Sequence, residues 1–195
     1  MAAQLIRAAW LVAAFTGQLV LGATPGQASD AAALAELAKP GRLLMLRHAL
    51  APGTGDPANF KLGDCSTQRN LDAVGRAQAE RLGARLRAAG ITRAKVYSSQ
   101  WCRCLETARR LDLGPVEELP LLNSIYQRPQ ERETRIPALR AFLAKLPTGN
   151  TPVIFVTHQF TISEFTGGGT GSGGGTVFAL NGTGEPRPVG ALSAD

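Results

Sequence analysis

Short apolar runs alternate along the chain with longer segments in which apolar residues recur at helical spacing. The runs within residues 42–47, 95–98 and 153–157 are rich in Leu, Ile, Val, Tyr and Phe. A continuous apolar run of about four to eight residues is typical of a strand buried on both faces of a parallel sheet. The pattern therefore predicts that these three segments are neighbouring parallel strands of one sheet.

A helix is expected in the first interval between strands. It runs to Ala89, with Asn70 or Asp72 as its N-cap and Gly90 just beyond its end. Its apolar face carries residues at helical spacing, namely Gly75, Ala79, Leu82, Gly83 and Leu86.

Further helices are expected at residues 31–38, at about 101–111, where Ser98-Ser99 offers a serine cap, and at 136–146. Strands that alternate with helices indicate the α/β class. The fold expected is a three-layer α/β/α sandwich with a mainly parallel sheet.

The remaining segments have weaker patterns. Residues 123–134 are polar and are expected to be irregular. The glycine-rich segment 167–175 is typical of a flexible loop, because it has neither the Gly-Lys-Ser/Thr ending nor the preceding strand of a phosphate cradle. An edge strand is expected at 176–180, followed by a flexible tail from about residue 181.

The first 28 residues have the pattern of a secretory signal peptide. A single charge, Arg7, precedes an apolar stretch and a run of small residues. We expect cleavage after Ala28 or, alternatively, after Ala23, so that residues 29–195 form one domain that is periplasmic or secreted and has no stable membrane span. The alternative is an uncleaved anchor, although polar residues interrupt the stretch before the roughly 20 apolar residues that a span needs.

Charge and cysteine content add to this picture. The net charge of +6 falls by one on removal of Arg7, and this modest excess suits an anionic substrate or envelope surface rather than a nucleic-acid partner. Export permits a disulfide between Cys65 and either Cys102 or Cys104, and three unpaired thiols are the alternative. The cysteines lack the spacing of a metal site, so no metal is expected. The oligomeric state stays open.

The only two histidines, His48 and His158, each follow one of the apolar runs. Ligands of open α/β sheets bind beyond the carboxyl ends of the strands, where Arg47 and the first-turn residue Arg103 are also expected. Arginine matches phosphate oxygens with a planar fork of donors. Such a site suits phosphoryl transfer through a covalent phosphohistidine. The competing interpretation is that the histidines are ordinary polar residues at strand ends.

Four motifs resemble those of the histidine phosphatase (phosphoglycerate mutase-like) superfamily. Leu44-Met45-Leu46-Arg47-His48 is similar to its Arg-His-Gly signature, and residues 70–79 to its Leu-Thr-x-x-Gly-x-x-Gln-Ala helix start. Ser98-Ser99 with Arg103 and Thr107-Ala108 resembles its Ser-Ser-Pro-x-x-Arg-x-x-x-Thr-Ala segment, and Val156-Thr157-His158 its second histidine. The resemblance spans about residues 42–165, in the family's order.

The resemblance implies a role for each matching position. His48 would be the phosphorylated nucleophile, Arg47 and Arg103 phosphate ligands, and His158 a stabiliser of the transferring group. Arg69 is a further candidate substrate ligand, or a surface partner of Asp64 or Asp72. Gln159 could orient His158 or touch the substrate.

Three positions depart from the family pattern. Ala49 and Gln100 replace a glycine and a proline, and Leu122-Asn123-Ser124 stands where many members carry a glutamate general acid. Serine does not deliver a proton as a carboxylic acid does. The general acid is therefore unknown, with candidates at Asp56, Asp64, Glu131 and Glu133. The alternatives are a substrate with a good leaving group and an enzyme that is slow.

The function expected is that of an exported, metal-independent phosphomonoesterase that forms a phosphohistidine and needs no cofactor. Its substrate would be a phosphorylated small molecule or an envelope glycan, the latter by analogy with exported relatives. The alternative is a non-catalytic anion-binding envelope protein with a degenerate phosphatase site.

Overall fold

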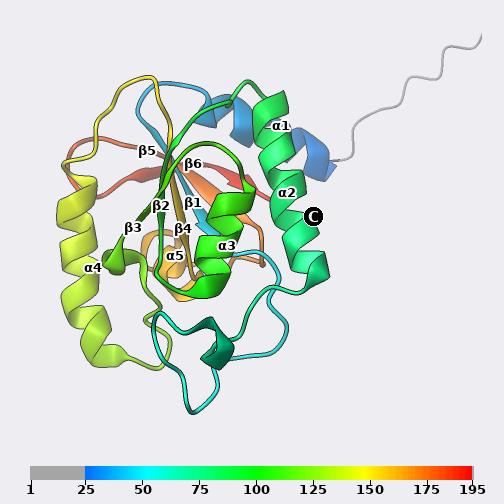
Figure 1. The fold of residues 1–195 in the computed structure, drawn as a ribbon. Helices are drawn as coiled ribbons and strands as arrows, with labels where there is room; N and C mark the ends of the chain where they lie inside the picture. Colours follow the sequence, from blue (N-terminus) through cyan, green and yellow to red (C-terminus); the bar gives the residue numbers. More distant parts are fainter. Residues whose placement is uncertain (1–24, 195) are drawn as a thin grey trace, which may run out of the picture.

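The structure, a computed structural model, describes residues 25–194, in which six strands form a single sheet. The strand order is β3-β2-β4-β1-β5-β6 (Figure 1). The strands are β1 (Arg42–Arg47), β2 (Lys95–Ser98), β3 (Val116–Glu118), β4 (Val153–Thr157), β5 (Gly175–Ala179) and β6 (Arg187–Leu192). The pairs β3–β2, β2–β4 and β4–β1 are parallel, and β5 is antiparallel to both of its neighbours, β1 and β6. The predicted class, a mainly parallel α/β sandwich, is confirmed, and so is the adjacency of β2, β4 and β1.

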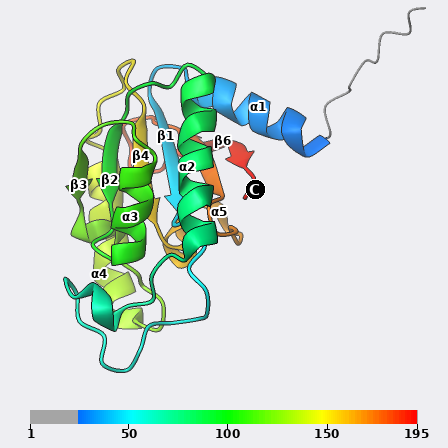
Figure 2. The same ribbon diagram turned by 45° about the vertical axis from the view of Figure 1, so that its right-hand side comes forward.

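Helices cover both faces of the sheet (Figures 1 and 2). On one face lie α1 (Pro25–Leu37), α2 (Ala73–Ala88) and α3 (Cys102–Arg110), and on the other α4 (Pro129–Leu143) and α5 (Gln159–Thr166). Two short 3-10 turns, η1 (Cys65–Thr67) and η2 (Pro120–Leu122), lie in the connections. The long loop between β1 and α2 projects beyond the end toward which β1 points (Figure 2).

The alternating side chains of β1 explain the unbroken apolar run in the sequence. Leu44 and Leu46 pack in the core under α1, α2 and α3, whereas Leu43 and Met45 pack in the core under α4 and α5. All four are fully buried. Successive side chains of a strand point to opposite faces, so a strand covered on both faces needs apolar residues at every position.

The helix starts were predicted with mixed success. Asp72 caps α2, because its carboxylate accepts a hydrogen bond from the backbone N–H of Gly75 at 2.7 Å. The serine cap of α3 was wrong. The N-cap is Trp101, without a side-chain hydrogen bond, and the hydroxyl of Ser99 bonds with His158 instead.

The carboxyl-terminal third is more ordered than its sequence pattern indicated. The strand expected at an edge, β5, lies inside the sheet between β1 and β6, and the expected tail contains the edge strand β6, which packs against α1. The sequence patterns of these segments are weak. They are strands because β5 pairs with β1, and β6 pairs with β5 and packs against α1. Residues 129–134, expected to be irregular, form the first turns of α4, which begins at Pro129, a favoured first helical residue.

The proposed signal segment lies outside the described residues except for its last four, which begin α1. Both expected cleavage sites therefore stay predictions. Within residues 25–194, no helix combines the length and apolar character required to cross a membrane.

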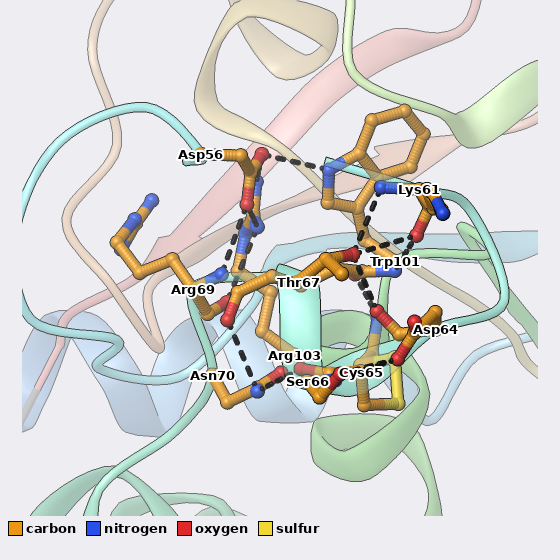
Figure 3. The surroundings of a disulfide bond; sticks show 12 residues. Asp56, Lys61, Asp64, Cys65, Ser66, Thr67, Arg69, Asn70, Trp101 and Arg103 are labelled. Carbon is orange, nitrogen blue, oxygen red and sulfur yellow. Dashed lines mark hydrogen bonds and ion pairs between the residues drawn. A yellow bond between two sulfur atoms is a disulfide. The ribbon is translucent and has the colours of Figure 1, made fainter. Parts of the chain in front are cut away.

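A disulfide joins Cys65 of η1 to Cys102 at the start of α3 (Figure 3). This is one of the two pairings that the sequence left open. Cys104 is free and buried. The bond holds the outer part of the long β1–α2 loop against the helix that carries Arg103.

Candidate active site

Side chains from the carboxyl ends of β1, β2 and β4 meet in one cavity of about 560 Å³. Register places Arg47 opposite Thr157 and Ser98 opposite Val156, so the three strands end at nearly the same level. The ring centroids of His48 and His158 are 5.6 Å apart. The two rings are therefore close enough for one phosphate to contact both, with hydrogen bonds of roughly 3 Å.

His48 is a buried, neutral imidazole. Its Nδ1 lies 2.7 Å from the carbonyl oxygen of Ala49. A carbonyl only accepts, so Nδ1 carries the hydrogen and Nε2 keeps its lone pair. Burial, and then the positive charge of Arg103, lower the pKa of His48 to about 3. The ring therefore presents an unprotonated nitrogen at neutral pH, as a nucleophile must.

His158 is also buried, and its ring lies edge-on to that of His48. Its Nε2 forms a hydrogen bond of 2.9 Å with the hydroxyl of Ser99, which is bonded in turn to Asn123. Burial, followed by the proximity of His48 and then Arg103, lowers the pKa of His158 well below its usual value. His158 is thus fixed in orientation and neutral.

Two arginines of the cavity have buried N–H groups without a protein partner. Arg47 donates from Nη1 to Gln159 at 2.9 Å and to the carbonyl of Thr170 at 2.7 Å, and Arg103 donates to Asp56 at 2.7 Å. The Nε atoms of both arginines are buried and unbonded in the described structure. Leaving a buried donor unpaired costs about 1–3 kcal/mol, so these two donors indicate a site for an anion.

Arg69 lines the same cavity. It does not pair with Asp64 or Asp72, the two partners that the sequence offered for it. Its guanidinium donates to the carbonyl oxygens of Gly55, at 2.8 Å, and Ala51. Asp64 instead caps η1 and Asp72 caps α2. Burial, and then Arg103, lower the pKa of Arg69. With Arg47 and Arg103, it gives the cavity a positive potential.

Asp56 is the only carboxylate among the described residues that line the cavity. It accepts hydrogen bonds from both Nη atoms of Arg103, from the indole of Trp101 at 2.9 Å and from the backbone N–H of Arg69 at 3.1 Å (Figure 3). Although burial raises its pKa, these bonds outweigh burial and lower it overall. Asp56 is therefore held as an anion that positions Arg103.

The other general-acid candidates lie elsewhere. Asp64 caps η1, Glu131 pairs with Arg135 on α4, and Glu133 lies on the same helix without lining the cavity. Ser124, at the position of the missing glutamate, does line it. Asp64, Glu131 and Glu133 therefore lie outside the cavity and are excluded as general acids.

Two residues of the quoted motifs hold the loop that carries His48, a role that sequence reasoning missed. Thr107 accepts a hydrogen bond from the backbone N–H of Ala49 at 3.0 Å. Gln78 accepts from Leu50 at 2.9 Å and donates to the carbonyl of Ser172 at 2.9 Å. The motifs Thr107-Ala108 and Gln78-Ala79 were the signal that could have identified them.

The glycine-rich segment was expected to be a flexible loop, but it packs against the site. The N–H of Gly173 donates to the carbonyl of His48 at 3.1 Å, and the carbonyl of Thr170 binds Arg47. Gln159, expected to orient His158 or touch the substrate, bonds with Arg47 and lines the cavity, so its contact with the substrate stays a prediction. The outer cavity wall, which includes Phe60, Tyr126, Arg128 and Phe160, was also missed, because these residues follow no spacing that singles them out.

The fold and the site together define an α/β protein with two neutral histidines facing an arginine-rich anion site. Residues 43–127 match the family model of the histidine phosphatase superfamily, branch 1. The matched segment, which includes His48 and Arg103, is similar to that superfamily. No curated protein matches it.

Solved structures with this fold are distant in sequence. A candidate phosphohistidine phosphatase, SixA, of Agrobacterium tumefaciens is 18% identical with a TM-score of 0.57, over 80% of this chain and 99% of its own. A protein histidine phosphatase SixA complexed with tungstate is 14% identical with a TM-score of 0.54, over 78% and 97% of the two chains. A mycobacterial glucosyl-3-phosphoglycerate phosphatase complexed with VO3 is 17% identical with a TM-score of 0.54, over 79% and 99%. At these sequence identities, the similarity shows a shared fold.

Proposed function

We propose that this protein is a phosphomonoesterase that hydrolyses its substrate through a phosphohistidine on His48. The observation that carries the proposal is the pair of buried, unpartnered N–H donors of Arg47 and Arg103 beside a neutral histidine. Phosphate oxygens would satisfy both donors. The match of residues 43–127 to a phosphatase superfamily supports the same activity, and two of the similar structures hold oxyanions, tungstate and VO3.

The reaction has two steps of phosphoryl transfer. Nε2 of His48 attacks phosphorus, an N–P bond forms, and the P–O bond to the leaving group breaks. Water then attacks the phosphohistidine, the N–P bond breaks, and inorganic phosphate is released. In both steps Arg47 and Arg103 hold the equatorial oxygens, and the neighbouring His158 stabilises the transferring group.

The test is hydrolysis of p-nitrophenyl phosphate by the purified mature protein with EDTA present. The wild type should turn over and form an acid-labile, base-stable phosphoenzyme. His48→Ala should abolish both, and His158→Ala should slow turnover at least about a hundredfold, the scale for loss of one preorganised donor. Wild-type activity in His48→Ala would contradict the mechanism. An exposed residue of α3, Arg109, supplies the control, because Arg109→Ala should leave the rate unchanged.

Metal independence is part of the proposal. The arginines supply the positive charge that a divalent cation supplies in many phosphoryl-transfer sites. Activity that EDTA removes and added metal restores would contradict it.

Export is also part of the proposal. The signal-like pattern of residues 1–28 supports it, and so does the disulfide between Cys65 and Cys102, since disulfides persist in oxidising compartments. The substrate would then be a phosphorylated small molecule or an envelope glycan. Cell fractionation with amino-terminal sequencing tests this. We expect periplasmic or secreted protein beginning at Ser29 or Thr24, and cytoplasmic protein with an intact amino terminus would contradict export.

One observation favours a second candidate, a non-catalytic anion-binding protein. The cavity has Ser124 in place of the acidic residue, and its only described carboxylate, Asp56, is held as an anion. The outcome that would select this candidate is tight vanadate binding by a wild-type protein that neither turns over nor forms a phosphoenzyme.

A further inference from the structure

The cavity extends well beyond the space that a phosphate needs, and its outer part is aromatic. The rings of Tyr126 and Phe160 stack with their centroids 5.1 Å apart, and both line the cavity. Phe160 is 46% exposed, although it lies only two residues after His158. A large apolar side chain that stays exposed beside a reactive group marks a ligand-binding surface.

A second aromatic wall belongs to the same cavity. Phe60 stacks on Trp101 with centroids 5.0 Å apart, and the guanidinium of Arg128 lies 5.5 Å from the Phe60 centroid and 5.2 Å from that of Trp101. Phe60 and Arg128 line the cavity together with Tyr126 and Phe160. Aromatic faces of this kind bind flat rings by stacking.

The segment that carries Tyr126 and Arg128 is held in an unusual conformation. Gln127, between them, has φ of 56°, a left-handed value that residues other than glycine seldom adopt. Such strain persists where the surrounding structure enforces it, often at ligand sites. The backbone here thus presents the side chains of Tyr126 and Arg128 to the cavity.

The lack of a proton donor restricts the leaving group independently. Among the described residues, the only carboxylate of the cavity is Asp56, and its pKa is lowered, so it holds no proton to give at neutral pH. The leaving oxygen must then depart as an anion. A phenol, with a pKa near 10 as in tyrosine, does this far more readily than an alkyl alcohol, whose pKa is much higher and close to that of water.

From these two observations we propose that the outer cavity is a subsite for the aromatic ring of a phenolic phosphate ester. The ring lies against the pair Tyr126–Phe160 and faces Phe60, while the phosphate occupies the histidine–arginine site. His48 attacks phosphorus, the aryl P–O bond breaks, and the phenolate leaves with the electron pair and takes its proton from water. This proposal rests on the proposed phosphatase function and, of its two substrate types, selects an aromatic small molecule over a glycan.

Four substrates distinguish binding of the aromatic ring from the requirement for a good leaving group. Phenyl phosphate has both features, and benzyl phosphate has the ring with an alkyl leaving group. Acetyl phosphate has a good leaving group without a ring, and glucose 6-phosphate has a sugar ring with an alkyl leaving group. We expect phenyl and benzyl phosphate to have similar KM values, with a kcat for benzyl phosphate at least about a hundredfold lower. Glucose 6-phosphate should have the lowest kcat/KM of the four.

Substitutions in the aromatic pair test the ring contact. Tyr126→Ala and Phe160→Ala should each lower kcat/KM for phenyl phosphate relative to acetyl phosphate by roughly threefold to tenfold, the scale of an aromatic pair. Acetyl phosphate turnover in the same samples reports whether each variant is folded. Leu62 is likewise 46% exposed but lies outside the cavity lining, so Leu62→Ala is the matched control and should leave the ratio unchanged.

Three results would overturn this inference while leaving the phosphatase function intact. They are comparable kcat values for benzyl and phenyl phosphate, a kcat/KM for glucose 6-phosphate above that for phenyl phosphate, or unchanged ratios in both alanine variants. Tyr126→Phe keeps the ring and removes the hydroxyl. A loss of kcat in that variant would identify Tyr126 as a proton donor and overturn the leaving-group argument. Failure of the wild type to form a phosphoenzyme from acetyl phosphate would instead reject the phosphatase function itself.

Discussion

At the scale of single residues, the site depends on which groups carry protons. His48 and His158 are both neutral because burial, and then the charged groups nearby, disfavour their protonated forms and lower their pKa values. Asp56 is an anion because four hydrogen bonds stabilise its charge. The protonation states therefore match a nucleophile and an anion site, but not a carboxylic acid catalyst.

A substitution at Asp56 tests its assignment as a positioning residue. Asp56→Asn should lower kcat/KM by roughly tenfold to a hundredfold, because a charge-assisted hydrogen bond to Arg103 contributes about 1.5–3 kcal/mol. The factor should be similar for phenyl and benzyl phosphate. A loss confined to benzyl phosphate, the more basic leaving group, would instead identify Asp56 as the general acid. Glu133→Gln, a candidate outside the cavity, should leave both substrates unaffected.

At the scale of elements, the contacts of α2 position the loop after β1. A Cβ added at Gly75 would lie 1.9 Å from the carbonyl oxygen of Leu50, and one added at Gly83 would lie 2.3 Å from that of Leu111. Both distances are below any van der Waals contact. The first contact is to the loop that carries His48, and the second is to the carboxyl-terminal end of α3, so α2 packs closely against the site loop at one glycine and against α3 at the other.

These two glycines predict different phenotypes. Gly75→Ala should displace Leu50 and lower phosphatase activity, whereas Gly83→Ala should lower the free energy of unfolding and leave the activity of the folded fraction near that of wild type. Alanine has the better helix propensity by about 1 kcal/mol, so destabilisation would have to come from the backbone contact. Thermal unfolding and initial rates on both variants measure the effects, and a more stable Gly83→Ala protein would contradict the packing argument.

At the scale of the whole molecule, the buried histidines couple stability to pH. Each has a folded-state pKa below its usual value near 6.5. The unfolded chain therefore takes up protons below pH 6.5 that the folded chain does not, down to about pH 3 for His48. Stability is fully present above pH 6.5 and is lost as the pH falls.

The free energy of unfolding should decrease between pH 6.5 and about 4.5, a range above the usual values for Asp and Glu. Two such histidines give a limiting slope of roughly 2.7 kcal/mol per pH unit, because each pKa unit is worth about 1.4 kcal/mol. Urea unfolding at a series of pH values measures this slope, and His48→Gln should halve it. A stability that stays constant across this range would show that the histidines are not buried as described.

How much the sequence determined differs between the parts of the chain. The three apolar runs determined β1, β2 and β4, because a doubly covered strand is apolar at every position and leaves a local signal. Asp72 indicated the start of α2, and the four motifs indicated the positions of His48, Arg103 and His158. The chemistry of the anion site could be derived from these residues because the ends of parallel strands meet at one edge of a sheet.

The rest was decided by the tertiary structure. The segments of β5 and β6 have weak patterns and form strands only where β1 and α1 lie beside them. The glycine-rich segment is fixed by hydrogen bonds to Arg47 and Gln78. The disulfide between Cys65 and Cys102, the hydrogen bonds that keep Asp56 ionised and the stack of Tyr126 on Phe160 join residues far apart in the chain. Such contacts depend on distances in space, which no local periodicity encodes.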